Sequence, residues 1–288
     1  MATWVIVGAG YTGQRVARAL ALRRDDVVVT RRTDGAAVES ARAAGPNVRG
    51  VCVDLDDPFS LDAIPSASTA SITRTSAAGA GPIIVCCAPP GRDPSAVRLL
   101  ADRAARFVYI SSTGVYPPAH GAWVHETTPV GPVTESGRAR VAAEAALPAS
   151  AIVLRAAGIY GADRNLVERI TTGTYRVVGD GRAHVSRIHV DDLVTAILRA
   201  GESPVTGPVN IADDDPAPLG EVADEIARRL GVALPPRVAA STVSPELAGM
   251  LTADRRIANR RMKEELGVTL RYPSWRDGLA DLLPPAPH

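Results

Sequence analysis

The chain has 288 residues, of which 46% are hydrophobic and 22% are charged, and its formal net charge is +1. This length allows one large domain, or one domain with a smaller lobe. The balanced charge excludes a global field that would favour nucleic acid or an anionic membrane. The apolar runs are shorter than the ~20 residues of a membrane span, and the N-terminus lacks the basic segment of a signal peptide. We therefore expect a cytoplasmic protein.

The first half of the chain alternates short β-branched runs with helical patterns. A run of this kind, bounded by turn residues, is typical of a strand buried on both faces. Alternation of strand and helix indicates right-handed βαβ units and a parallel sheet. The strands are expected at 3–8, 26–30, 48–54, 82–88, 106–112 and 151–157, with helices at 11–24, 34–45, 94–105 and 135–147.

The predicted fold is therefore α/β, a Rossmann-type doubly wound parallel sheet with a small C-terminal substrate lobe. Residues 1–160 form the NADP-binding core in this prediction. Residues 161–288 supply the lobe and are interleaved with the last sheet strands, so that the chain is one structural unit. Later helices are expected at 190–201, 219–231 and 259–267.

The cysteines predict neither a disulfide framework nor a metal site. There are three of them, Cys52, Cys86 and Cys87, and no Cys/His cluster has the spacing of zinc ligands. Cys86 and Cys87 lie inside the apolar run IIVCCA, where a small buried hydrophobic residue is expected rather than a reactive thiol.

The segment VIVGAGYTGQRVARAL carries a glycine motif between the first strand and the first helix. Gly8 permits a tight turn, Gly10 leaves room for a pyrophosphate, and Gly13 lets helix and strand pack closely. Backbone N–H groups at the helix start, around Tyr11 and Thr12, face the phosphates together with the helix dipole. The motif therefore predicts dinucleotide binding.

The end of the second strand favours NADP over NAD. An NAD site usually carries an acid there to accept from the ribose 2′-hydroxyl, whereas this strand ends in Arg31 and Arg32. Two guanidinium groups can hold a 2′-phosphate, although a solvated basic strand end is the alternative. Asp54 and Leu55, after the third strand, are expected beside the adenine, and Ala88 is assigned to the cofactor site as well.

Several later motifs appear in a familiar order: RFVYISSTGVY, a helix opening SGRARVAAE, then LRAAGIYG, RIHVDD and RRMKEELG. With the glycine motif they resemble the extended short-chain dehydrogenase/reductase family, the NAD(P)-dependent epimerases, dehydratases and reductases. The resemblance runs from about residue 4 to residue 282. The form of the glycine motif and a helix beginning TESGR resemble the atypical YeeZ-like branch of this family.

The resemblance implies catalytic positions at Ser112 and Tyr116. The family's catalytic Tyr and Lys, spaced as YxxxK, fall on Ser136 and Arg140. A serine hydroxyl has a far higher pKa and a shorter arm than a tyrosine, so Ser136 is a poor candidate for the general acid. Arginine keeps the positive charge that holds the ribose, but it is a poor proton relay because it effectively never deprotonates.

The resemblance also implies that Gly158 and Ile159 flank the nicotinamide and that Tyr160, Asn165 and Arg187 face the substrate. Another acid would then move the proton. The candidates for that acid are Tyr116, Tyr160, His120, His125, His184 and His189, with a structural role favoured for His189 and a surface role for His120 and His125.

Two functions remain open from the sequence. One is an oxidoreductase, epimerase or dehydratase that acts on a small metabolite, and the other is a catalytically silent NADP-binding sensor or regulatory partner. A displaced register of the 135–147 helix is disfavoured, because no Tyr lies between 117 and 159. A helix-turn-helix at 219–249 is disfavoured too, because Pro235 and Pro236 follow the turn. By analogy with the family, helices 95–106 and 135–147 could form a homodimer.

Overall fold

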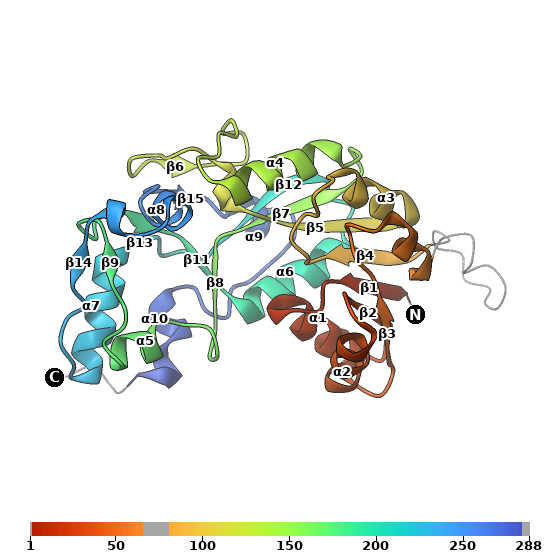
Figure 1. The fold of residues 1–288 in the computed structure, drawn as a ribbon, viewed down its shortest axis with the longest axis horizontal. Helices are drawn as coiled ribbons and strands as arrows, with labels where there is room; N and C mark the ends of the chain where they lie inside the picture. The colour runs from red at the N-terminus through yellow and green to blue at the C-terminus, as the bar shows by residue number, and fades with distance from the viewer. Residues whose placement is uncertain (1, 66–80, 284–288) are drawn as a thin grey trace. The chain divides into compact units, whose positions relative to one another are not determined.

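The computed structural model describes residues 2–65 and 81–283. Its largest element is a seven-stranded parallel sheet with the strand order β12-β7-β5-β4-β1-β2-β3 (Figure 1). This arrangement confirms the predicted α/β class and the Rossmann-type sheet. The strands are β1 (Thr3–Val7), β2 (Asp26–Arg31), β3 (Val48–Cys52), β4 (Ile83–Cys86), β5 (Arg106–Ser112), β7 (Ile152–Ala156) and β12 (Gly207–Ile211).

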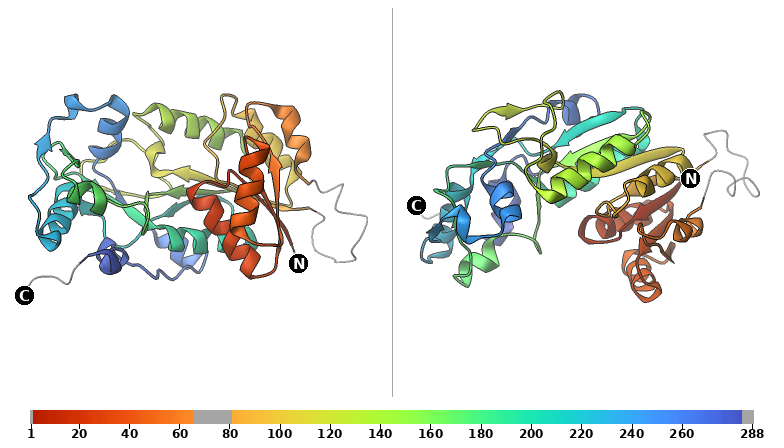
Figure 2. Two further views of the ribbon diagram at one scale, coloured as in Figure 1. Left: turned by 60° about the horizontal axis from the view of Figure 1, so that its bottom comes forward. Right: turned by 45° about the horizontal axis from the view of Figure 1, so that its top comes forward.

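Helices cover both faces of this sheet, as the views in Figure 2 show. The bounds are α1 (Tyr11–Leu22), α2 (Asp34–Ala44), α3 (Ser95–Arg103), α4 (Glu135–Ala146) and α6 (Val190–Glu202), with a 3₁₀ turn η1 (Pro58–Ala63). All five helices lie where the sequence predicted them. Helix α2 begins at the N-cap Thr33, whose side chain accepts from the Ala36 N–H.

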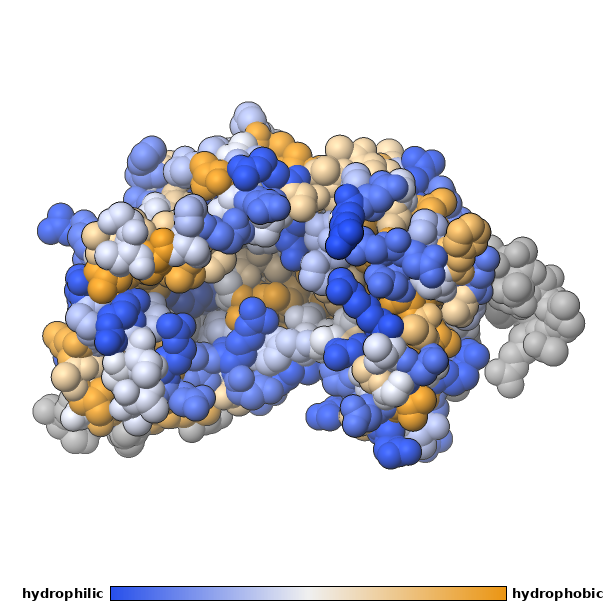
Figure 3. Space-filling view, in the orientation of Figure 1, coloured by the Kyte–Doolittle hydropathy of each residue, from blue (hydrophilic) through white to orange (hydrophobic). Residues whose placement is uncertain are grey.

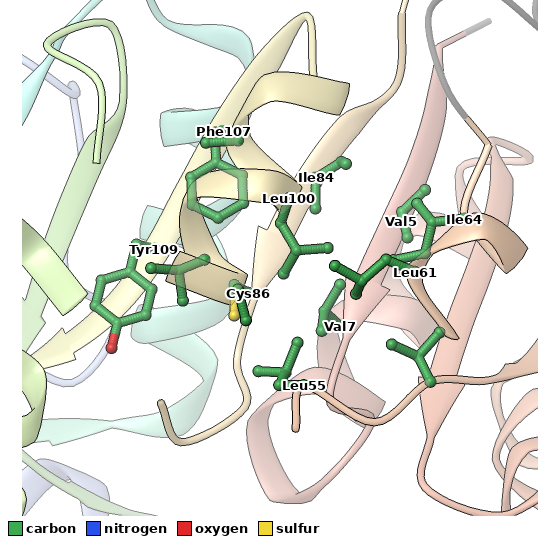
Figure 4. Packing of buried hydrophobic residues seen from close by; sticks show 14 of the residues in the cluster. Val5, Val7, Leu55, Leu61, Ile64, Ile84, Cys86, Leu100, Phe107 and Tyr109 are labelled. Atoms are coloured by element: carbon green, nitrogen blue, oxygen red, sulfur yellow. The ribbon is translucent and has the colours of Figure 1, made fainter. Parts of the chain in front are cut away.

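Strand β1 is apolar at every position after Thr3 because both of its faces are buried. Val5 and Val7 belong to a cluster with Leu100 of α3, shown in Figure 4. The intervening Trp4 and Ile6 point to the other face, where a Cβ at Gly201 of α6 would lie 2.2 Å from the Trp4 ring. Successive side chains thus enter two separate cores.

Cys86 belongs to the same cluster and is fully buried, as predicted for a small hydrophobic residue. Burial raises the pKa of its thiol to about 12. A thiol that stays protonated near neutral pH is a poor nucleophile, so this residue serves packing.

The chain divides into two compact units. The first contains Met1–Ser111, Ala139–Arg155 and Val194–Val209, and the second contains Ser112–Arg138, Ala156–Leu193 and Asn210–His288. The second unit holds the predicted C-terminal lobe together with residues 112–138, which the prediction had placed in the Rossmann core. The chain therefore enters the second unit three times.

The second unit is built from short paired strands and short helices, most of which the sequence did not predict. Two-residue and three-residue strands show no usable periodicity, because alternation needs about four residues to be recognised. The strands are β6 (Trp123–Val124), β8 (Gly158–Tyr160), β9 (Val177–Val178), β10 (His184–Val185), β11 (Arg187–His189), β13 (Ala217–Pro218), β14 (Arg237–Val238) and β15 (Arg256–Ile257). The helices are α5 (Val167–Thr171), α7 (Leu219–Leu230), α8 (Pro245–Leu251), α9 (Arg260–Glu264) and α10 (Trp275–Gly278), with 3₁₀ turns η3 (Thr113–Val115), η4 (Ala240–Thr242) and η5 (Ala280–Leu282).

Helix α7 does not continue into a recognition helix. It ends at Gly231, which has φ +68° and closes the helix in the left-handed conformation. Strand β14 and turn η4 separate it from α8, so the tight turn of a helix-turn-helix is absent between these two helices. The lobe interpretation of this segment is the one that the structure supports.

Hydrophilic residues are spread over both units on the face drawn in Figure 3. Within residues 2–65 and 81–283, no helix combines the length and the apolar character that crossing a bilayer requires.

Candidate cofactor and substrate sites

The three glycines of the β1–α1 loop meet three different requirements. Gly8 has φ +87°, and a Cβ there would lie 2.7 Å from the Ala88 backbone nitrogen. A Cβ at Gly13 would lie 2.4 Å from the Gly8 carbonyl oxygen. At Gly10 the same construction meets no atom within 4 Å. Packing therefore explains Gly8 and Gly13, whereas the space beside Gly10 is open to a ligand.

The start of α1 offers backbone donors to that space. Gly10 is the N-cap of the helix and supplies no side-chain hydrogen bond to the first turn. The loop is fixed on β2, because the Gly8 N–H donates to Thr30 Oγ1 (3.1 Å) and the Ala9 N–H to the Thr30 carbonyl oxygen (3.0 Å). A fixed loop with free helix donors suits an anion. These residues fit the pyrophosphate of a dinucleotide.

Tyr11 and Thr12 flank this loop in different ways. The Arg15 guanidinium lies 4.1 Å from the centre of the Tyr11 ring, whereas the Thr12 side chain is buried. Both residues lie in the first turn of α1, so the prediction for them concerns their backbone N–H groups and not their side chains.

The two arginines at the end of β2 have different environments. Arg31 Nη1 donates to the Ala9 carbonyl oxygen at 2.7 Å, so this side chain braces the glycine loop. The Arg32 side chain is 72% exposed, and its Nε lies 3.9 Å from Asp54 Oδ1. Of the two, Arg32 is the one available to a further phosphate.

The two residues predicted beside the adenine, Asp54 and Leu55, differ in how deeply they are buried. Asp54 is half-buried, and its carboxylate accepts from the Asp56 N–H at 3.1 Å. Leu55 is a member of the cluster in Figure 4 and is buried. Their position beside an adenine stays a prediction.

Arg140 is held on α4 by a buried network that the sequence did not indicate. Its Nη1 donates to the Ile110 carbonyl oxygen of β5 at 2.9 Å. One turn further along the helix, Glu144 pairs with Arg155 of β7 at 2.7 Å, and both side chains are almost fully buried. Ser111 Oγ donates to the same carboxylate at 2.5 Å. The network fixes this part of α4 against β5 and β7.

Ser112 and Tyr116 both form hydrogen bonds with other residues of the second unit. Ser112 Oγ accepts from the Gly114 N–H at 3.0 Å, which leaves its own hydrogen free to donate. The Tyr116 hydroxyl donates to Asn210 Oδ1 at 2.8 Å, and the residue is fully buried. This arrangement suits an orienting role for Ser112, but it does not favour Tyr116 as a proton donor.

The hydroxyl of Ser136 is committed to a carboxylate. It donates to Glu246 of α8, and Glu246 also accepts from the Glu135 N–H (2.9 Å) and the Ser136 N–H (3.4 Å). Thr134 Oγ1 accepts from the Gly137 N–H at 3.2 Å. The hydrogen bond from Ser136 holds the pKa of Glu246 below its usual range, so Glu246 stays ionised. Ser136 therefore takes part in capping α4, which does not favour a role as general acid.

Strand β8 pairs in parallel with β11, which sets Gly158 opposite Arg187 and Tyr160 opposite His189. Gly158 is exposed and Ile159 is half-buried, as residues beside a ligand would be. Tyr160 is buried and its hydroxyl donates to the Ser274 carbonyl oxygen at 3.3 Å. Burial raises the pKa of this phenol, which makes it a weak acid.

Asn165 has a structural use that the sequence analysis missed. Its amide nitrogen donates to the Gly161 (3.1 Å) and Ala162 (2.7 Å) carbonyl oxygens, and its Oδ1 accepts from the Val167 N–H at 2.8 Å. The amide is thus consumed in the turn that starts α5. Both donors of the amide are used within this turn, and a role of Asn165 in substrate binding stays a prediction.

The two histidines with defined contacts are bound to neighbouring side chains. His184 Nδ1 lies 2.8 Å from Asp254, and its Nε2 lies 3.1 Å from an Arg256 nitrogen. His189 packs between the rings of Tyr160 and Tyr272. These contacts agree with a structural role for His189. His120 and His125 are exposed.

Arg187 and Asp213 are adjacent charged residues inside the second unit. The Asp213 N–H donates to the Arg187 carbonyl oxygen at 2.7 Å, and both side chains are buried. Arg187 Nη1 donates to the Val185 carbonyl oxygen at 2.8 Å. Burial raises the pKa of Asp213 to about 8, although the positive charge of Arg187 opposes the shift. The sequence analysis selected Arg187 but not Asp213.

A family model for the NAD dependent epimerase/dehydratase family matches residues 4–212. The chain belongs to this family. Protein YeeZ of Escherichia coli K12 is 34% identical over 284 residues, which cover 93% of this chain and 95% of YeeZ. The predicted family and its YeeZ-like branch are thereby confirmed.

Two further proteins are similar to this member of the epimerase/dehydratase family. A 3-diazoavenalumate denitrifying reductase of a Streptomyces species is 37% identical over 139 residues, which cover 44% of this chain and 45% of the reductase. A solved structure from Silicibacter pomeroyi, described as a functionally unknown conserved protein, shares 31% identity with a TM-score of 0.79 over 98% of both chains.

The residues that were not predicted from the sequence share one property: each has its partner on another element of the fold. Glu246 and Asp213 meet their partners from distant parts of the chain, and the Glu144–Arg155 pair joins a helix to a strand. In the case of Asp213 the available signal was an acid at the end of the short apolar run VNIAD (209–213). For Glu246 there was no signal, since α8 has only seven residues and too few turns to show a pattern.

Proposed function

We propose that the chain is an NADP-dependent reductase that works without the family's tyrosine acid. The observation that carries this proposal is the end of β2, where Arg31 and the exposed Arg32 stand at the position of an acid and Arg31 braces the glycine loop. A site that prefers NAD needs a carboxylate there to accept from the ribose 2′-hydroxyl. Arg32 supplies a donor fork for a 2′-phosphate instead.

Each cofactor contact has a residue to make it. The backbone donors of the first turn of α1, from Tyr11 to Gly13, hold the pyrophosphate, and Arg31 keeps the glycine loop in place. Arg140 holds the ribose hydroxyls from its fixed position on α4. The bound nicotinamide supplies or accepts a hydride at its C4 carbon.

The proton side of the reaction is the unusual part. Tyr116 donates to Asn210, Ser136 donates to Glu246, and arginine effectively never releases a proton. Ser112 keeps a free hydroxyl hydrogen with which to orient a substrate oxygen. A reduction whose acceptor needs hydride but no proton therefore fits these residues best.

A diazonium carbon is such an acceptor, and the name of the Streptomyces relative supports it. The carbon–nitrogen bond breaks, dinitrogen leaves with the bonding electron pair, and the hydride forms the new carbon–hydrogen bond. The nicotinamide is oxidised and the carbon is reduced, and no proton enters or leaves. Carbonyl and imine reduction both need a proton as well, which would have to come from water.

Cofactor choice is tested by fluorescence titration with NADPH and NADH. Replacing one charge-assisted contact to a phosphate costs about 1.5–3 kcal/mol. Arg32→Ala should therefore weaken NADPH binding by roughly tenfold or more and leave NADH binding unchanged. Arg49→Ala is the matched control, because Arg49 is similarly exposed (62%) on β3 and pairs with Asp26. Equal affinity for NADPH and NADH would remove the preference, and no binding of either would overturn the proposal.

Turnover separates the reductase from a catalytically silent NADP-binding regulator. The regulator is the second candidate, because the same hydrogen bonds leave neither Tyr116 nor Ser136 available as an acid. Carbonyl, imine and aryl diazonium compounds are offered with NADPH, and its oxidation is followed by absorbance. The reductase predicts oxidation with a diazonium compound and an unchanged rate in Ser136→Ala. Tight NADPH binding with no turnover of any class would favour the regulator.

A further inference from the structure

Two charged side chains of the second unit are more than nine-tenths buried and have no part in the function proposed above. Arg187, at the start of β11, is 8% exposed, and Asp213, which follows β12, is 1% exposed. The backbone hydrogen bond between them keeps the two residues adjacent. Buried charges of this kind are normally paired or bound to a ligand.

Arg187 has more donors than the surrounding protein uses. A guanidinium carries five N–H donors, and the one side-chain hydrogen bond of Arg187 within the described residues goes to the Val185 carbonyl oxygen. The same part of the chain holds no ion pair between Arg187 and a carboxylate. The remaining Arg187 nitrogens are not among the buried atoms that lack a partner, so these N–H groups are open to solvent and can donate to an acceptor from outside the fold.

Asp213 offers a further donor at the same place. Its Oδ1 accepts from the Asp215 N–H at 3.3 Å, while its Oδ2 is buried with no partner among the described residues. Because burial raises the pKa of this carboxyl to about 8, it carries a proton at neutral pH and can donate it in a hydrogen bond. Trp275, in the hydrophobic cluster with Tyr160 and Tyr175, also has a buried indole N–H with no partner in that part of the chain. The unmet groups are thus mainly donors.

We propose that Arg187 and Asp213 bind the carboxylate group of the substrate. The proposal names the substrate class of the reductase above, and it rests on that function. A carboxylate accepts two parallel N–H groups from a guanidinium and has lone pairs left for the Asp213 hydroxyl. One negative charge also matches the one guanidinium, whereas a phosphate dianion would carry a second charge into a buried site. The substrate is therefore a small carboxylic acid.

Binding should then depend on the protonation of Asp213. The charged and titratable groups around Asp213 are Arg187, Tyr160, Asp214 and Asp215. Two of these acids already have cationic partners: Asp214 pairs with Lys263, and Asp215 pairs with Arg276. Burial lowers the pKa of Arg187, but a guanidinium effectively never deprotonates in a protein, so Arg187 keeps its charge. As pH rises through about 8, Asp213 loses its proton, and an acceptor with a negative charge replaces the donor. Carboxylate binding should weaken accordingly.

The test measures binding of benzoate to the full chain by ligand-observed NMR, with benzamide as the uncharged match. We expect benzoate to bind at least tenfold more tightly than benzamide at pH 7. Arg187→Gln should remove this difference. Raising the pH from about 7 to about 9 should weaken benzoate binding roughly tenfold in the wild type but not in Asp213→Asn, which cannot ionise. Arg182→Gln, at a 90% exposed arginine of the same unit, should change nothing.

Three results would overturn the carboxylate site: equal binding of benzoate and benzamide, unchanged benzoate binding in Arg187→Gln, or tighter binding of inorganic phosphate than of benzoate. Arg187→Gln alone could unfold the lobe, so Arg187→Gln/Asp213→Asn provides a neutral pair for the same comparison. NADPH titration of the same samples keeps the two proposals apart. Intact NADPH binding without benzoate binding rejects the carboxylate site, and the reverse rejects the function proposed for the whole chain.

Discussion

Helices α1 and α4 both begin beside predicted ligand positions, but their first turns are completed in opposite ways. The first turn of α1 receives no side-chain cap, and the space beside its N-cap Gly10 is open. The first turn of α4 receives two, one from Thr134 and one from Glu246. A helix whose first-turn N–H groups have no acceptor from the chain can bind an anion there. A helix whose first-turn N–H groups already donate to the chain's own side chains cannot. The comparison separates a helix start that is open to an anion from one that the chain's own side chains occupy.

The largest effect on cofactor binding should come from filling the α1 loop. Gly13→Ala would put a Cβ 2.4 Å from the Gly8 carbonyl oxygen, so we expect a loss of about 2–3 kcal/mol of unfolding free energy. NADPH binding should be lost with it. Thermal unfolding and NADPH titration measure the two effects.

Gly10→Ala is the matched variant, since Gly10 has φ −82° and open space around it. It should keep the wild-type melting temperature yet weaken NADPH binding at least tenfold, because the new methyl group occupies the space for the pyrophosphate. A melting temperature that falls as far as in Gly13→Ala would contradict the division between packing glycines and a ligand glycine.

The next effect concerns the second unit and its buried acid. The folded-state pKa of Asp213 is about 8 and its ordinary value is 3.8, so between these pH values the folded state holds a proton that the unfolded state releases. Stability should therefore fall as pH rises through this window, by up to roughly 1.4 kcal/mol per pH unit. Chemical denaturation at pH 5, 6, 7 and 8 should show this slope in the wild type and not in Asp213→Asn. Asp214→Asn, beside it and paired with Lys263, should keep the slope.

The smallest effect should come from opening the start of α4. Glu246→Ala removes the acceptor of two backbone N–H groups, which should cost about 1 kcal/mol of stability. Glu246→Gln keeps an acceptor oxygen and should lose less. Because the folded-state pKa of Glu246 is lowered, its contribution is present above its ordinary pKa and is lost as pH falls through the lowered value. NADPH affinity should stay unchanged in both variants, and a change would mean that α4 is capped for the cofactor.

The parts of the fold that the sequence predicted well are those with local causes. The close packing at Gly8 and Gly13 follows from the glycine motif, and the strands follow from apolar runs long enough to recognise. Asn165 was predicted to face the substrate because the family resemblance indicates where the residue lies along the chain. The resemblance does not indicate which hydrogen bonds its side chain makes. Its neighbours in the chain use both donors of its amide and one lone pair of its oxygen.

The rest of the candidate site depends on partners that sequence spacing does not reveal. Ser136 and Glu246 are 110 residues apart, and the carboxylate arrives on a helix whose sequence carries no strong pattern. The pKa of Asp213 depends on how deeply its strand end is buried, which no motif encodes. The sequence showed that Ser136 stands where the family has a tyrosine. It did not show that the Glu246 carboxylate accepts a hydrogen bond from this serine.

The buried pair of Glu144 and Arg155 has a consequence for how this family member can evolve. Losing one partner would leave the other charge without compensation, at a cost of about 3–5 kcal/mol, whereas replacing both by apolar residues can be neutral. A lineage can therefore abandon the pair only through an intermediate that folds poorly. Among descendants of this protein, the two positions should be inherited together or changed together, and Arg140 with its helix should remain in place for as long as they do.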